Sequence, residues 1–227
     1  MFKDRSEAGQ KLAKILEEFK NSNAIVLALP RGGIVIGEEI AEELNLPLDI
    51  IAVRKIGSQE SEEYAIGAID IDGEGAWNED ELKTTDKEWL KHKIDKEKIE
   101  TKRRYETYRQ NKPPLNISGK TAILVDDGIA TGLTMKAAAK YAQKLNAGKI
   151  IIAAPLAPKE TIEDLKKEAD TRILETPPYF FSINQFYENF PQIEDKKVVE
   201  ILNSQSRYFP APSNYVQVHI DIDHLGL

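Results

Sequence analysis

The chain alternates short, continuous apolar runs with longer segments in which apolar residues recur every three or four positions. Runs of the first kind are typical of strands buried on both faces, and the recurring pattern is typical of amphipathic helices. The runs predict strands at residues 24–29, 48–53, 64–71, 121–125, 149–154 and 171–174. The helical spacing predicts helices at about residues 5–20, 34–44, 132–145 and 159–169. This order predicts an α/β fold whose core is a doubly wound, mainly parallel sheet.

Three segments interrupt or follow this alternation, so the core is expected to span residues 1–176. Residues from about 84 to 111 are highly charged with sparse apolar positions, which predicts a long, solvated helical insertion. A homo-oligomer contact is the alternative for this helix, and it would use Trp89, Tyr105 and Tyr108. Residues 177–202 are rich in aromatic side chains and predict a small C-terminal cap or hood. Residues 203–227 form a C-terminal arm to which the sequence assigns no role.

Charge and composition exclude several classes of protein. Among 227 residues, 31 Lys and Arg face 38 Asp and Glu, and the net charge of −7 favours neither nucleic acid nor an anionic membrane as partner. The absence of cysteine excludes disulfides, thiolate catalysis and zinc–thiolate sites. No apolar stretch is long enough to cross a bilayer, and the first residues lack a secretory pattern, so a cytoplasmic protein is expected.

The most informative polar residues follow the apolar run at residues 122–125. Asp126 and Asp127 come directly after this strand, and open α/β sheets bind ligands at the carboxyl ends of their strands. A turn of small and hydroxyl residues then leads into a helix, whose first amides converge on an anion. These candidate phosphate-binding residues are Gly128, Ile129, Ala130, Thr131, Gly132, Leu133 and Thr134. Two carboxylates beside such a turn suit sugar hydroxyls or a hydrated Mg²⁺ held through water.

A second glycine-containing loop follows the first predicted core strand. Arg31, Gly32 and Gly33 could bind a second anion, because paired glycines let amides approach phosphate oxygens and arginine supplies a charged fork. Arg54 and Lys55 follow the next strand and add two cations. Taken alone, each loop also fits a plain polar turn between a strand and a helix.

Together these motifs resemble the type I phosphoribosyltransferases, over most of residues 1–190. Asp4 with Arg5 and the motifs at residues 30–33, 53–57 and 125–132 occur together in an uncharacterised group of that family. The resemblance implies that the protein binds phosphoribosyl pyrophosphate and Mg²⁺ and transfers the phosphoribosyl group to a nitrogenous base.

The same resemblance implies roles for the motif residues. Asp126 and Asp127 would orient the ribose, the turn that follows them would hold the 5′-phosphate, and Arg31 with its two glycines would bind pyrophosphate. Arg54 and Lys55 would lie on a mobile loop and neutralise the departing pyrophosphate. Asp4 is expected to start a helix, which needs no role in the site, and Arg5 stays a minor candidate for the site.

One position departs from part of the family and narrows the choice of acceptor. In the hypoxanthine–guanine branch an aspartate near the purine N7 precedes the Thr-Gly pair, where this chain has Ala130. A methyl group cannot transfer a proton, so 6-oxopurine chemistry is disfavoured and the acceptor base stays unidentified. A regulatory protein that senses phosphoribosyl pyrophosphate without turnover is the alternative function. The aromatic residues of the expected cap would stack on the base or belong to the core.

Overall fold

The protein is described from a computed structural model, in which residues 1–205 are placed. A five-stranded sheet with all neighbours parallel forms the core, in the order β2-β1-β6-β7-β8. Its strands are β2 (Leu48–Ile50), β1 (Ala24–Ala28), β6 (Thr121–Val125), β7 (Lys149–Leu156) and β8 (Asp170–Glu175). The central position of β6 places the residues that follow it in the middle of the sheet's carboxyl edge, and the predicted parallel core is confirmed.

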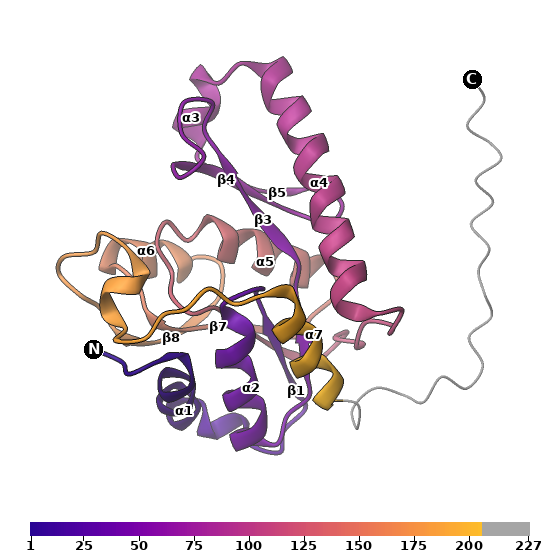
Figure 1. Cartoon of the computed structure of the whole chain (residues 1–227), viewed down its shortest axis with the longest axis vertical. Coiled ribbons are helices and arrows are strands. Elements are labelled where there is room, and N and C mark those ends of the chain that lie inside the picture. Colours follow the sequence, from indigo (N-terminus) through magenta and orange to yellow (C-terminus); the bar gives the residue numbers. More distant parts are fainter. Residues whose placement is uncertain (206–227) are drawn as a thin grey trace.

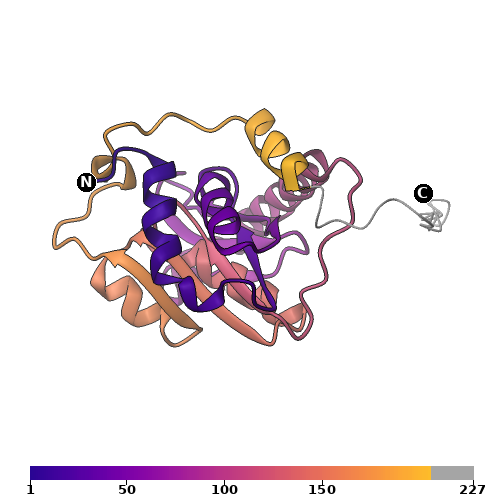
Figure 2. The ribbon, with the colours of Figure 1, turned by 90° about the horizontal axis from the view of Figure 1, so that it is seen from below.

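Helices cover both faces of this sheet, as a doubly wound fold requires (Figures 1 and 2). One face packs on α1 (Arg5–Ile15) and α2 (Gly33–Leu44), and the other packs on α5 (Leu133–Lys144) and α6 (Lys159–Leu165). Neighbouring residues of β1 show the division, since Val26 belongs to the first cluster and Leu27 to the second. Burial on both faces explains why each core strand is continuously apolar.

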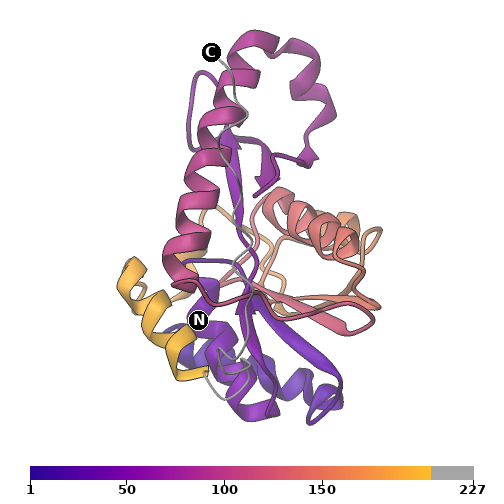
Figure 3. The same cartoon turned by 90° about the vertical axis from the view of Figure 1, so that its right-hand side faces the viewer.

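A separate lobe, which we call the hood, comprises residues 53–109, which follow β2 and precede β6 in the sequence. It projects from the core (Figures 1 and 3). Its strands form an antiparallel sheet in the order β3-β4-β5. The elements of the hood are β3 (Val53–Gly57), β4 (Ala65–Asp70), β5 (Gly75–Trp77), α3 (Glu79–Thr84) and α4 (Lys87–Arg109). Small side chains such as Ala68 pack one face on α5, and Ile56 and Ile69 pack the other on α4.

The hood accounts for the main differences from the sequence-based expectations. The apolar run at residues 48–53 is divided, because β2 ends at Ile50 and Val53 begins β3. The strand expected at residues 64–71 exists, but it pairs antiparallel in the hood instead of joining the core sheet. Its two covered faces give it the same continuous apolar pattern as a parallel strand. The hood sheet is thus internal to the chain, whereas the sequence placed a hood at the C-terminal residues 177–202.

Two helices also begin or end differently from expectation. The first α-helix ends at Ile15 and is followed by a 3₁₀ turn, η1 (Glu17–Phe19), although Asp4 caps its start as the sequence indicated. The long charged helix begins at Lys87, because the Asp86 side chain accepts a hydrogen bond from the Trp89 amide and starts the helix there.

After β8 the chain crosses the face of the core that α1 and α2 cover. This segment is irregular except for a 3₁₀ turn, η2 (Ile183–Phe186), and the helix α7 (Asp195–Ser204). Helix α7 packs against α2 and α4 (Figure 1). Of the expected arm at residues 203–227, all but the end of this helix lies outside the described residues. Of the three aromatic residues suggested for an oligomer contact, Trp89 packs in the hood, Tyr108 is buried, and Tyr105 is partly buried against the core. Among residues 1–205, no helix has both the length and the apolar character to cross a bilayer.

Candidate functional site

The two adjacent carboxylates lie at the carboxyl end of β6, the central strand of the core sheet. Asp127 is buried and Asp126 is half-buried, and the Asp127 amide donates to Oδ1 of Asp126 at 2.8 Å. Burial, together with the neighbouring carboxylate, raises the pKa of Asp126 well above its ordinary value. Burial also raises the pKa of Asp127, although the Arg5 guanidinium opposes this shift.

Arg5, at the start of α1, reaches this acidic pair from a distant part of the sequence. Its Nε lies 2.7 Å from Oδ2 of Asp127, and its Nη1 donates to the Pro191 carbonyl at 2.8 Å. The guanidinium also stacks 3.6 Å from the centre of the Phe190 ring. The sequence marked Arg5 only through its place beside Asp4. Its partner is 122 positions away, so only the folded chain shows the contact.

The loop with the paired glycines packs directly against the acidic pair. A Cβ added to Gly32 would lie 1.8 Å from Oδ2 of Asp127, and one added to Gly33 would lie 2.6 Å from the Val125 carbonyl oxygen. No side chain fits at either position without moving the carboxylate or the strand. The peptide bond between Pro30 and Arg31 is cis. The two sequence motifs, which are about a hundred residues apart, therefore form one continuous surface.

The turn between β6 and α5 presents backbone donors at the start of a helix. Gly132 has a φ of +76°, a conformation that suits glycine and directs the chain into α5. Within residues 1–205, the backbone amides of residues 130–134 donate no hydrogen bond to a carbonyl outside helix α5. The Ile129 amide differs, since it donates to the Leu156 carbonyl. Ile129 and Leu133 are buried and support the turn, while Thr131 is exposed beside it.

Two of the cavities beside these loops bear on the site. The first, of about 310 Å³, brings together Arg5, Arg31 and Gly32 with three residues of the C-terminal segment, and we call it the arginine cavity. Its other lining residues are Phe190, Gln192 and Ile193. The second cavity, of about 350 Å³, lies between the hood and the turn after β6, with Thr131 and Leu133 on one side and Tyr64 and Trp77 on the other.

The two cations expected on a mobile loop lie instead on strand β3 of the hood. The Nε of Arg54 lies 2.5 Å from Oε2 of Glu97, and the Nζ of Lys55 lies 3.1 Å from Oε2 of Glu63. Neither residue lines the arginine cavity. The structure therefore brings the acidic pair, the glycine loop and the turn together, but it does not add Arg54 and Lys55 to that group. Arg31 lies at its edge, with Nη1 3.6 Å from Oδ1 of Asp195.

Comparisons with known proteins agree with this geometry. Residues 5–191 match the family described as "Phosphoribosyl transferase domain". Two curated proteins of Mycobacterium tuberculosis, from strains CDC 1551 and H37Rv, are each named "Putative phosphoribosyl transferase". Each is 38% identical over 212 residues, which cover 92% of this chain and 48% of the relative. The chain thus spans about half the length of these relatives. The crystal structure of TT1426 from Thermus thermophilus is 33% identical, with a TM-score of 0.77, 90% of this chain covered and 98% of that chain.

Proposed function

The chain belongs to the phosphoribosyl transferase domain family, and on that basis we propose that it transfers the phosphoribosyl group of phosphoribosyl pyrophosphate to a nitrogenous base. The observation that carries this proposal is the packing of Gly32 against Asp127. This contact joins two loops at the carboxyl edge of the sheet that we propose as backbone anion sites, with the acidic pair between them. A donor that carries a phosphate at one end and a pyrophosphate at the other requires such an arrangement.

The turn after β6 is the proposed site of the 5′-phosphate. Within residues 1–205, the amides of residues 130–134 have no carbonyl acceptor outside α5, and the helix dipole favours an anion at its start. Thr131 and Thr134 add hydroxyl donors. The half-buried Asp126 is the carboxylate that faces a sugar, and it would accept hydrogen bonds from ribose hydroxyls. Asp127, held by Arg5, would fix the position of the loops rather than exchange partners.

The arginine cavity is the proposed site of the pyrophosphate group. Arg5 and Arg31 supply two guanidinium groups at its wall, and Gly32 lets backbone amides approach an anion. Positive charge placed here would stabilise the charge that develops on the leaving group. Arg54 and Lys55 do not line this cavity and pair with Glu97 and Glu63 in the hood, so they would contribute only if they left those partners for the pyrophosphate.

The residues at the acidic pair fit a magnesium ion bound mainly by the donor. Among residues 1–205, no group of three or more histidine, cysteine or acidic side chains could hold a metal ion. Mg²⁺ commonly uses one or two carboxylates, waters and substrate phosphates instead of a protein cage. Asp126 would therefore hold the ion through water, and Asp127 could contribute only through the oxygen that Arg5 leaves free. When bound, it would supply positive charge next to the pyrophosphate oxygens.

The proposed reaction is a substitution at the anomeric carbon of the ribose. A lone pair on the base nitrogen forms the new C–N bond, the C–O bond to pyrophosphate breaks, and pyrophosphate leaves with that electron pair. Two bound phosphate groups would hold the ribose in line with the base, which lowers the entropic cost of the step. The proton lost by the base goes to water or to the pyrophosphate, because Ala130 offers no acid–base group.

Release of pyrophosphate in the presence of candidate bases tests this proposal. The protein is incubated with MgCl₂, phosphoribosyl pyrophosphate and, one at a time, adenine, guanine, hypoxanthine, uracil and orotate. We expect base-dependent release with at least one acceptor outside the 6-oxopurines, and none from the variant with both Asp126→Asn and Asp127→Asn. Donor binding without release for any base would contradict the transferase and support a sensor of phosphoribosyl pyrophosphate.

A further inference from the structure

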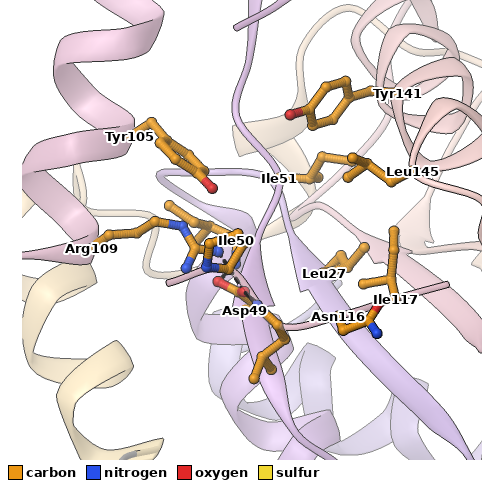
Figure 4. A pocket seen from close by; sticks show the side chains of 12 residues that line it. Leu27, Asp49, Ile50, Ile51, Tyr105, Arg109, Asn116, Ile117, Tyr141 and Leu145 are labelled. Carbon is orange, nitrogen blue, oxygen red and sulfur yellow. Dashed lines mark hydrogen bonds and ion pairs between the residues drawn. The ribbon is translucent and has the colours of Figure 1, made fainter. Parts of the chain in front are cut away.

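A third cavity lies away from the donor site, where the hood joins the core (Figure 4). Its volume is about 310 Å³, at the lower end of the range of small-molecule sites. None of the residues assigned above to phosphate, ribose or pyrophosphate lines it. Tyr141, at its wall, is roughly 12 Å along α5 from Leu133 at a helical rise of about 1.5 Å per residue. We call it the junction cavity.

Both chain connections between the core and the hood form walls of the junction cavity. Ile50 and Ile51 line it just before the chain enters β3, and Leu115 and Ile117 line it after the chain leaves α4. A molecule in the cavity would therefore touch both connections at once. It would oppose rotation of the hood against the core, because any rotation changes both walls.

The charged residues at the cavity wall neutralise each other. The Nη2 of Arg109 lies 2.5 Å from Oδ2 of Asp49, and both side chains are at most 5% exposed. The Leu115 amide also donates to Asp49. A charged ligand would find no unpaired counter-charge in this wall and would lose its hydration on entry. The Nε of Arg109 is buried without a hydrogen-bond partner, and the guanidinium lies over the Tyr105 ring, 4.7 Å from its centre.

The remaining polar side chains are Asn116, whose Oδ1 accepts a hydrogen bond from the Ser118 amide, and two tyrosines with hydroxyls on opposite sides of the cavity. Tyr105 projects from α4 and Tyr141 from α5, and Figure 4 shows each hydroxyl directed toward the space between the helices. Burial raises the pKa of Tyr105 and raises that of Tyr141 to about 12, so both remain neutral donors near pH 7. Branched apolar side chains such as Leu27 and Ile117 form the rest of the wall.

We propose that the junction cavity is a binding site for an uncharged, planar heteroaromatic molecule, of a size between a nucleobase and a nucleoside. Apolar walls suit its ring faces, and the tyrosine hydroxyls suit hydrogen-bond acceptors at its edge. The neutral wall selects against charged ligands. This site is separate from the proposed transfer reaction and does not depend on it.

Benzimidazole and adenosine are suitable probes, and Leu145 allows the cavity to be blocked. Leu145 lines the cavity and is 40% exposed, so Leu145→Trp would place a bulky ring at its edge with little effect on the buried core. Leu145→Ala is the matched control. Binding is measured by saturation-transfer NMR and calorimetry, and circular dichroism checks that each variant is folded.

We expect saturable binding of at least one probe to the natural protein. Its affinity should fall by about tenfold or more in Leu145→Trp and stay within about threefold in Leu145→Ala. The variant with Asp126→Asn and Asp127→Asn should bind the probe as the natural protein does. No saturable binding of either probe would overturn the proposal. Equal affinity in Leu145→Trp, or loss of binding in the double aspartate variant, would also overturn it, because the probe would then sit elsewhere.

Discussion

Replacement of Arg5 by glutamine tests the link between the first helix and the acidic pair. The Arg5 and Asp127 side chains are 8% and 11% exposed, so their ion pair is shielded from solvent. Removing one partner of a buried pair costs about 3–5 kcal/mol, because the other charge is left without compensation. Loss of the stacking on Phe190 adds about 1 kcal/mol. We therefore expect Arg5→Gln to lower the free energy of unfolding by about 5 kcal/mol at pH 8.

The loss should depend on pH in a defined direction. The folded-state pKa of Asp127 is already raised, and removal of Arg5 would raise it further. A carboxyl whose folded pKa lies above its unfolded value contributes stability at low pH that is lost as the pH rises through the folded pKa. The difference between Arg5→Gln and the natural protein should therefore be smallest near pH 4 and grow toward pH 8.

Urea titration followed by far-UV circular dichroism measures this loss. Tryptophan fluorescence gives a second probe, since Trp77 and Trp89 both lie in the hood, and coincident curves support two-state unfolding. Arg103→Gln is a matched control that removes an exposed ion pair with Glu100 and should cost far less. The reasoning is refuted if Arg5→Gln costs no more than this control, or costs as much when Asp127→Asn is already present.

Three further substitutions test other parts of the account. Gly32→Ala should weaken binding of phosphoribosyl pyrophosphate by about tenfold or more in calorimetry, because its Cβ would displace Asp127; unchanged affinity would contradict this. Asp126→Asn should stabilise the ligand-free protein by about 1–2 kcal/mol at pH 8 in urea titrations, and by less near pH 4, because it removes a carboxylate whose pKa is raised; a loss of stability would count against it. Asp49→Asn should cost about 3–5 kcal/mol in the same titrations by leaving Arg109 buried and unpaired, and a loss below about 1 kcal/mol would disprove that role.

The core, and the position of the loops that we propose to bind the donor, were predictable because their signals are local. A strand covered on both faces must be continuously apolar, and a loop that lets a backbone approach an anion needs glycine, so residues 121–134 indicate both a strand and an anion site. The same signal misassigned β4. Its residues, including Ala65 and Ile69, are buried between two helices of different parts of the chain, and their pattern cannot indicate which sheet they join.

The contacts that complete the site were not predictable from local sequence. Arg5 reads as an ordinary first-turn residue, and its partners Asp127, Phe190 and Pro191 come from distant segments. Tyr187 is similar, since its hydroxyl donates to the Asp127 carbonyl and fixes the same turn from the C-terminal segment. The aromatic residues there serve two purposes: Tyr187 is buried, while Phe181 is 86% exposed. Composition alone cannot separate these environments.

Calorimetric titration of phosphoribosyl pyrophosphate in the presence of MgCl₂ tests the central claim most directly. We predict saturable binding with one donor per chain for the natural protein. In the variant with Asp126→Asn and Asp127→Asn, we predict affinity weaker by about a hundredfold or more, equivalent to about 2.7 kcal/mol. Absence of donor binding to the natural protein, or equal affinity in the variant, would contradict the assignment of this site.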